Sequence, residues 1–157
     1  MELRELVEGF ASACGLTDLA LNAEGVVVFE ADEMPVRISD MSDARVFVME
    51  GQIGDPPVEC RDQFEQSLLR LNLSLLPAAG VSVALAENDT YVLQSVCGYE
   101  YLSVDAFVER VRKFLDELER LHALLAAFAP EAEGLAETAG NVADEARFTS
   151  FGNFVQV

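Results

Sequence analysis

The amino-acid sequence predicts an α+β fold: an antiparallel sheet flanked by helices in the order α-β-β-β-α-β-β-α, followed by a C-terminal extension. Three observations predict it. Apolar residues recur at helical spacing in three separate segments, 3–14, 60–76 and 103–128. Short runs rich in β-branched residues lie between these segments and are separated by turns. The chain has 157 residues, of which 51% are hydrophobic, which is enough for one domain with its own core.

The first segment is predicted to be an amphipathic helix. A glycine follows at position 15, where a left-handed residue commonly ends a helix. Three glutamates in the first turns suit the positive end of the helix dipole. The apolar residues fall on one face at spacings of three and four: Leu3, Leu6, Val7, Phe10, Ala11 and Cys14.

Three strands are predicted next, at residues 26–30, 36–39 and 45–50. The first is β-branched throughout its start, and the second alternates apolar with polar residues, as a half-buried strand does. Turn residues bound them, including an Asn-Ala-Glu-Gly sequence at 22–25 and a Gly-Asp-Pro-Pro sequence at 54–57.

Residues 60–76 are predicted to form a second helix, although 71–75 also alternate as a strand would. The length of the segment without an internal breaker favours the helix. One stripe of it carries Phe64, Leu68, Leu71 and Leu75, and a second carries Leu69, Leu73 and Leu76. A helix with apolar residues on two faces must bury both. It lies deep in the monomer or meets another subunit, and we favour the subunit interface.

A hairpin and a long helix complete the predicted domain, residues 1–128. The hairpin joins 81–85 to 91–96, and Ser103 is a suitable N-cap for the helix that follows. His122 falls on the apolar face of this helix, so we interpret it as a packed histidine and not as a catalytic one.

Residues 129–157 form the C-terminal extension, which begins with Pro130 and an Ala/Glu-rich stretch. Its last ten residues contain Phe148, Phe151 and Phe154. Terminal segments are usually polar, so this density needs a reason. Two alternatives remain open: a segment packed against the domain, or a short strand added to the edge of a sheet, its own or a partner's.

Composition excludes several classes of function. The formal net charge is −18, from 28 Asp and Glu against 10 Lys and Arg, which disfavours nucleic-acid binding. The apolar content is too high for a disordered acidic chain, and no apolar run approaches the roughly 20 residues of a membrane span. Three separated cysteines and the lack of a signal-peptide pattern favour reduced thiols and a cytoplasmic protein.

We find no pattern that predicts catalysis. The sequence has no phosphate-binding glycine loop, no nucleophile elbow and no set of ligands for zinc, and it contains a single histidine. Pairs of carboxylates carry little information in so acidic a chain. We therefore expect no catalytic residue, no metal and no cofactor, and interpret the protein as one that binds another protein.

Three stretches carry a resemblance to a known family. Leu68-Leu69-Arg70-Leu71-Asn72 on the second helix precedes Gly80-Val81-Ser82-Val83-Ala84-Leu85 and Tyr91-Val92-Leu93-Gln94. With the order of elements, the small size and the acidity, residues 1–128 resemble the class I chaperones of bacterial type III secretion. The resemblance implies a homodimer without enzymatic activity that binds the N-terminal region of a secreted effector and keeps it non-globular.

The resemblance also implies which residues bind. Dimer contacts in the family carry over to Phe64, Leu68, Leu71 and Leu75 on the second helix. Effector contacts in the family use the first helix and the sheet, and here we expect the following residues: Leu6, Phe10, Val27, Phe29, Ile38, Phe47 and Met49. An alternative function is a regulatory module of the same fold that sequesters a folded protein.

Overall fold

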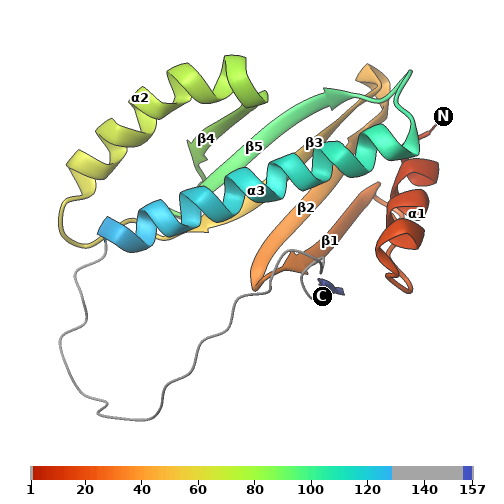
Figure 1. Cartoon of the computed structure of the whole chain (residues 1–157), viewed down its shortest axis with the longest axis horizontal. Helices are drawn as coiled ribbons and strands as arrows, with labels where there is room; N and C mark the ends of the chain where they lie inside the picture. The colour runs from red at the N-terminus through yellow and green to blue at the C-terminus, as the bar shows by residue number, and fades with distance from the viewer. Residues whose placement is uncertain (1, 129–153, 157) are drawn as a thin grey trace, which may run out of the picture.

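A computed structural model describes residues 2–128 and the backbone of residues 154–156 (Figure 1). It contains three α-helices and a six-stranded sheet, with a short 3-10 turn η1 (Ser42–Ala44) before the third strand. The order confirms the predicted α-β-β-β-α-β-β-α arrangement and adds one strand at the C-terminus. The elements are α1 (Leu3–Cys14), β1 (Val26–Ala31), β2 (Met34–Met41), β3 (Val46–Gly54), α2 (Arg61–Ala79), β4 (Val81–Leu85), β5 (Tyr91–Gly98), α3 (Val104–Phe128) and β6 (Phe154–Gln156).

The sheet is antiparallel at every pairing, with the strand order β4-β5-β3-β2-β1-β6. β1 and β2 form a hairpin whose two turn residues, Asp32 and Glu33, both have positive φ (49° and 66°). Two successive residues of this kind match the right-handed twist of the strands. β3 lies between β2 and β5 and does not pair with β4, the next strand along the chain. After β3, α2 and β4 carry the chain to the far edge of the sheet, and β5 then returns between β4 and β3.

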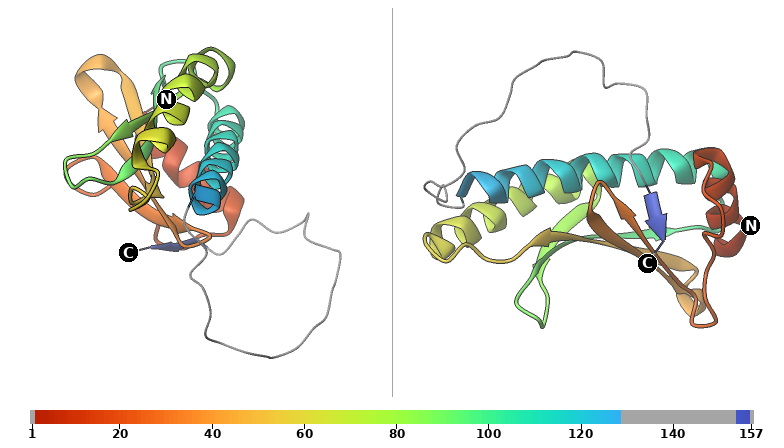
Figure 2. Two further views of the ribbon diagram at one scale, coloured as in Figure 1. Left: turned by 90° about the vertical axis from the view of Figure 1, so that its left-hand side faces the viewer. Right: turned by 90° about the horizontal axis from the view of Figure 1, so that it is seen from below.

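One face of the sheet is covered by α3 and α1 (Figure 2). The ring of Phe107 on α3 lies between Phe10 of α1 (6.1 Å between centroids) and Phe47 of β3 (5.3 Å). These three side chains are at most 2% exposed. The aromatic cluster therefore joins both helices to the sheet at the centre of the core.

The ends of the helices follow from local chemistry. α1 begins with a capping box in which the Glu2 backbone N–H donates to the Glu5 carboxylate (3.0 Å), and it ends at Gly15 with φ 68°. The Ser103 hydroxyl accepts the backbone N–H of Ala106 (3.2 Å), as expected for the start of α3. These observations confirm both predicted boundaries.

Residues 71–75 are helical, which confirms the predicted second helix and excludes the alternative strand; α2 continues to Ala79. One local expectation is corrected. His122 is not packed into the apolar face: the residue is exposed, and its Nδ1 lies 2.8 Å from the carbonyl oxygen of Ile53. The buried stripe of α3 includes Leu118 and Leu121, and His122 lies beside this stripe, close to the end of β3.

Candidate protein-interaction surfaces

The outer face of α2 carries an exposed leucine stripe, Leu69, Leu73 and Leu76. These side chains are 68%, 81% and 61% exposed. Their spacing of four and three residues places them on one side of the helix. Figure 1 shows α2 beside β4 at the end of the molecule. Leu68 and Leu75 on the opposite side of the helix are buried, so this stripe faces away from the core. Exposed apolar side chains gathered in one stripe are typical of a surface that contacts another protein.

The predicted dimer residues lie mostly on the inner face of the same helix. Phe64, Leu68 and Leu75 are at most 4% exposed and belong to the core of the single chain, and Leu71 is half-buried against it. Phe64 packs its ring against Phe128 of α3 (5.1 Å). A side chain buried in this way is not available to a second copy. Both apolar stripes were visible in the sequence, but periodicity alone does not tell which one faces the sheet.

Asn72 fixes α2 to the edge strand β4. Its Oδ1 accepts the backbone N–H of Val83 (2.7 Å), and its Nδ2 donates to the Val83 carbonyl (3.0 Å). The amide thus imitates a neighbouring strand and satisfies edge groups that would otherwise be open to pairing. This is the asparagine of the Leu-Leu-Arg-Leu-Asn stretch, so the residue quoted for the resemblance has a structural role here.

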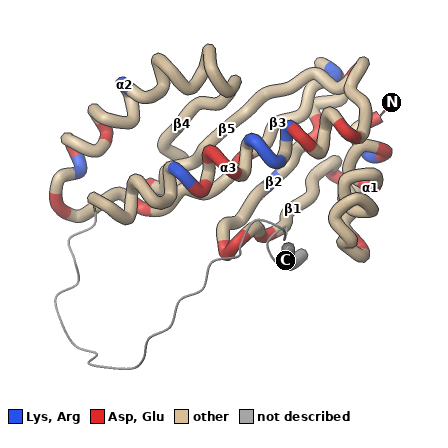
Figure 3. Tube along the Cα trace, in the orientation of Figure 1, with Lys and Arg blue, Asp and Glu red and all other residues tan. Residues whose placement is uncertain are grey.

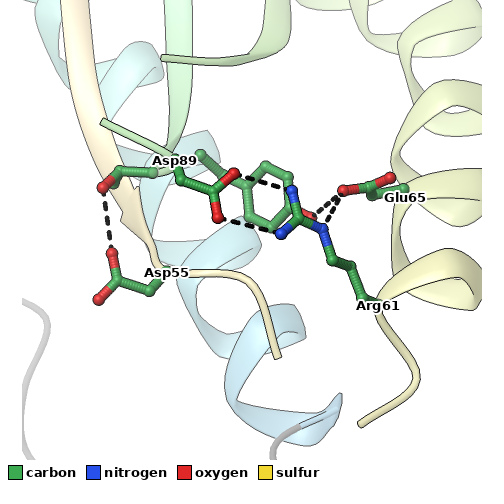
Figure 4. A network of polar contacts seen from close by, with 6 residues as sticks. Asp55, Arg61, Glu65 and Asp89 are labelled. Carbon is green, nitrogen blue, oxygen red and sulfur yellow. Dashed lines mark hydrogen bonds and ion pairs between the residues drawn. The ribbon is translucent and has the colours of Figure 1, made fainter. Parts of the chain in front are cut away.

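A polar network joins the start of α2 to the β4–β5 turn (Figure 4). The guanidinium of Arg61 donates two bonds to Asp89 (3.0 and 2.8 Å) and one to Glu65 (2.8 Å). The Tyr91 hydroxyl also donates to Glu65 (2.9 Å). Nearby, Thr90 donates to Asp55 (3.0 Å). Together with Asn72, this network holds α2 against the hairpin at two points, the middle of β4 and the β4–β5 turn.

The network changes the titration of its members. The hydrogen bond from Arg61 holds the pKa of Asp89 below its ordinary value, and the same donor, with Tyr91, lowers the pKa of Glu65. Burial, followed by the hydrogen bond to Glu65, raises the pKa of Tyr91 to about 12. The paired charges therefore persist through neutral pH, where the function of this network is to position α2.

All seven predicted effector-binding residues lie in the core. Each is at most 3% exposed, because α1 and α3 cover the face of the sheet to which the strand residues point. They are Leu6, Phe10, Val27, Phe29, Ile38, Phe47 and Met49. Alternation identified the correct apolar face of each strand, but that face is the inner one. These side chains cannot contact a partner without unfolding part of the core.

The opposite face of the sheet is turned away from the helices and is partly apolar. Register places Val26, Ser39, Val48 and Val96 in one row across β1, β2, β3 and β5. Val96 is 60% exposed, whereas Val48 is only 9% exposed. Within the described residues, the Ser39 hydroxyl is the one buried side-chain polar atom without a hydrogen-bond partner. The next row is polar.

That polar row crosses the same face. Arg37 lies 3.9 Å from Glu50, and Gln94 donates to Glu50 at 3.3 Å. We refer to the two rows together as the open sheet face. The valines of this face could not be singled out from the sequence, because each is the outward member of an alternating pair.

Of the tail residues, Phe148 and Phe151 lie outside the described residues, and Phe154 is the first residue of β6. β6 pairs antiparallel with β1, with Val155 opposite Glu30. One of the two alternatives for the C-terminal segment, a strand added to a sheet edge, therefore agrees with the described backbone.

Charged residues of the described part of the chain are spread over all three helices and the turns (Figure 3). Several of the basic residues lie on α3, where Arg112 and Arg120 pair with Glu109 (3.1 Å) and Glu117 (2.7 Å). In the part of the chain that the structure describes, no group of His, Cys, Asp and Glu could hold a metal ion, and the three cysteines are free. No helix among these residues is long and apolar enough to cross a membrane.

These features define an α+β module that presents apolar surfaces to other polypeptides. Residues 5–122 match the model of the Tir chaperone protein (CesT) family. The chain therefore belongs to this family, which confirms the family assignment made from the sequence. The comparison with curated protein sequences gives no match.

Solved structures share the fold. A chain of the HopA1–SchA chaperone–effector complex superposes with a TM-score of 0.66 and 20% identity, over 77% of this chain and 93% of that one. A chain of the ExsC–ExsE complex superposes with a TM-score of 0.70 and 20% identity, over 85% of this chain and 100% of that one. The structure of the Yersinia pestis type III secretion chaperone SycH with a fragment of YscM2 gives a TM-score of 0.60 and 21% identity, over 75% of this chain and 98% of that one.

Proposed function

We propose that the protein is a homodimeric type III secretion chaperone of the bacterial cytoplasm. It binds the N-terminal region of a secreted effector, keeps that region non-globular and acts without catalysis. The observation that carries the proposal is membership of the Tir chaperone family over residues 5–122. The fold shared with a chain of the HopA1–SchA chaperone–effector complex and with the type III secretion chaperone SycH complex supports the same function.

The dimer forms through the exposed leucine stripe of α2. Removing a leucine side chain from water contributes about 1.5–3 kcal/mol, so a stripe that is duplicated by two-fold symmetry supplies a substantial apolar contact. This assignment transfers the expected interface from Phe64, Leu68, Leu71 and Leu75 to Leu69, Leu73 and Leu76, because the former pack within their own chain.

We expect Leu73→Asp to convert the dimer to a monomer. Size exclusion with light scattering should give the wild type a molar mass of twice the 17.1 kDa of one chain, and the variant the mass of a single chain. A buried unpaired carboxylate disfavours association strongly. Val58→Asp is the matched control, since Val58 is 98% exposed on another part of the surface. A wild-type monomer, or a dimeric Leu73→Asp variant, would contradict the assignment.

The effector fragment lies on the open sheet face. Val96, which is 60% exposed, and the half-buried Val26 provide apolar contacts there. A non-globular segment suits such a shallow surface, because it contacts a broad area without needing a deep pocket.

The test uses two probes derived from one effector, such as the product of the neighbouring gene. We expect its isolated N-terminal fragment to bind and its folded remainder not to bind. Val96→Asp should weaken fragment binding by about ten-fold, equivalent to about 1.4 kcal/mol. Leu85→Asp, at 48% exposure on β4, is the control and should bind as the wild type does. Binding of the folded part alone would favour a regulatory module instead.

A further inference from the structure

The two edges of the sheet are protected in different ways. At the β4 edge, Asn72 binds both backbone groups of Val83. At the β1 edge, Asn22 binds the backbone of Val26, its Oδ1 accepting the Val26 N–H (2.9 Å) and its own N–H donating to the Val26 carbonyl (2.8 Å). The remainder of the β1 edge meets β6 from the end of the chain (Figure 2).

The hairpin fixes which groups of β1 face outward. Ala31 and Met34 flank the two-residue turn, so alternate residues, Phe29 and Ala31, bond to β2. The Asp40 N–H donates to the Gly25 carbonyl (2.8 Å), which gives the same alternation from the other end. The backbone groups of Val28 and Glu30 consequently point away from β2. Val155 lies opposite Glu30, in position to exchange both hydrogen bonds with it.

β1 lacks the features that usually prevent strand addition at an edge. Its sequence, VVVFEA, contains no proline and no lysine, and its register with β2 has no bulge. Val27, Phe29 and Ala31 are at most 4% exposed and anchor the strand in the core. The edge is thus rigid, regular and β-branched, which favours pairing with another strand.

We propose that β6 of the same chain is an internal occupant of the outer edge of β1, where it competes with the pairing of an extended segment from a partner polypeptide. The incoming segment binds antiparallel to β1 and hydrogen-bonds to Val28 and Glu30. β6 has 3 residues and β1 has 6, so a segment that pairs along more of β1 displaces β6. The consequence for an effector rests on the proposed function.

The first experiment tests the internal docking without any partner. In the full chain, Val155→Pro removes the N–H that the register directs toward the Glu30 carbonyl and so disfavours pairing of β6 with β1. Val155→Thr retains the N–H and the β-branch. Amide hydrogen exchange of Glu30 should be faster in Val155→Pro and unchanged in Val155→Thr. The Phe29 amide, which bonds to β2, is the internal reference and should stay protected in both. Equal Glu30 exchange in the two variants would overturn the proposal.

The second experiment measures competition with a defined probe, a labelled peptide of residues 148–157. The apparent Kd of the peptide rises as the fraction of molecules with a free edge falls. If β6 leaves the edge free about a tenth of the time in Val155→Thr, the peptide should bind about ten-fold more tightly to Val155→Pro, in which the edge is free. A peptide with proline at the position of Val155 should not bind. Equal affinity for both variants, or no binding to Val155→Pro, would overturn the proposal.

Two further measurements distinguish β6 of the same chain from a strand of a second copy, and failure of the docking proposal from failure of the proposed function. Protection of Glu30 that disappears on dilution would show that the strand comes from a second copy and would overturn the internal assignment. An effector fragment should bind Val155→Pro more tightly than Val155→Thr, and equal binding would overturn the competition. If no fragment binds either variant while the peptide result holds, the proposed function fails and the docking edge stands.

Discussion

At the scale of single residues, Gly51 determines how closely α3 approaches the sheet. A Cβ added to it would lie 2.5 Å from Leu118 Cδ2 and 3.2 Å from Phe114 Cε1. Both neighbours are at most 1% exposed, so neither can move aside into solvent. The missing side chain in β3 is what allows α3 to cross the strand in close contact.

We expect Gly51→Ala to reduce the free energy of unfolding by about 1–3 kcal/mol through overpacking. Gly98→Ala is the control, because the nearest atom to its added Cβ is the Arg45 carbonyl oxygen at 4.0 Å, and it should change stability by less than about 0.5 kcal/mol. Urea unfolding measures both. Adding Leu118→Val should recover part of the loss, and strictly additive effects would contradict the contact as the cause.

At the scale of elements, the attachment of α2 to the hairpin rests on polar contacts as much as on the core. Asn72, in the middle of α2, makes two hydrogen bonds to one residue of β4, and Arg61 joins the N-terminal end of the helix to the turn. If α2 carries the dimer contact, these bonds set the position of the exposed leucine stripe relative to the sheet.

Asn72→Ala should lower the free energy of unfolding by about 1–3 kcal/mol, because it leaves the N–H and carbonyl of Val83 without partners at a half-buried edge. It should also increase self-association beyond the dimer, since an open β4 edge can pair with another chain. Gln66→Ala, an exposed site on the same helix, is the control. Chemical denaturation and light scattering check the two effects, and a variant as stable as Gln66→Ala would refute the role of Asn72.

The same elements show what sequence can predict. Helical spacing and β-branching located each helix and strand of residues 1–128, because these signals are local. Which stripe of α2 faces inward could not be predicted, since Leu68 and Leu69 differ by burial (4% and 68%) and not by chemistry. The same holds for Phe47 and Val48: both are apolar neighbours in β3, and the placement of α3 alone separates core from open face. The partner of β6 is likewise a long-range contact.

At the scale of the whole molecule, the charge of −18 acts against the compact state, and local ion pairs do little to offset it. Pairs such as Arg112–Glu109 and Arg45–Glu100 are largely exposed, where each contributes at most about 1 kcal/mol. The same charge limits aggregation of a chain that exposes the leucines of α2 and the valines of the open sheet face.

Salt should therefore have opposite effects on folding and on binding. Raising ionic strength from about 0.01 to 0.15 M shortens the screening length from about 30 to about 8 Å, which weakens repulsion among the carboxylates and should raise the urea midpoint. If the acidic surface attracts basic segments of an effector, the same change should weaken fragment binding. The control is a repeat at lower pH, toward the sequence pI of about 4.1, where fewer carboxylates are charged and both effects should shrink. A urea midpoint that falls with salt would show that attractive pairs outweigh the net repulsion, and salt-independent binding would show that the effector is recognised through the apolar surfaces alone.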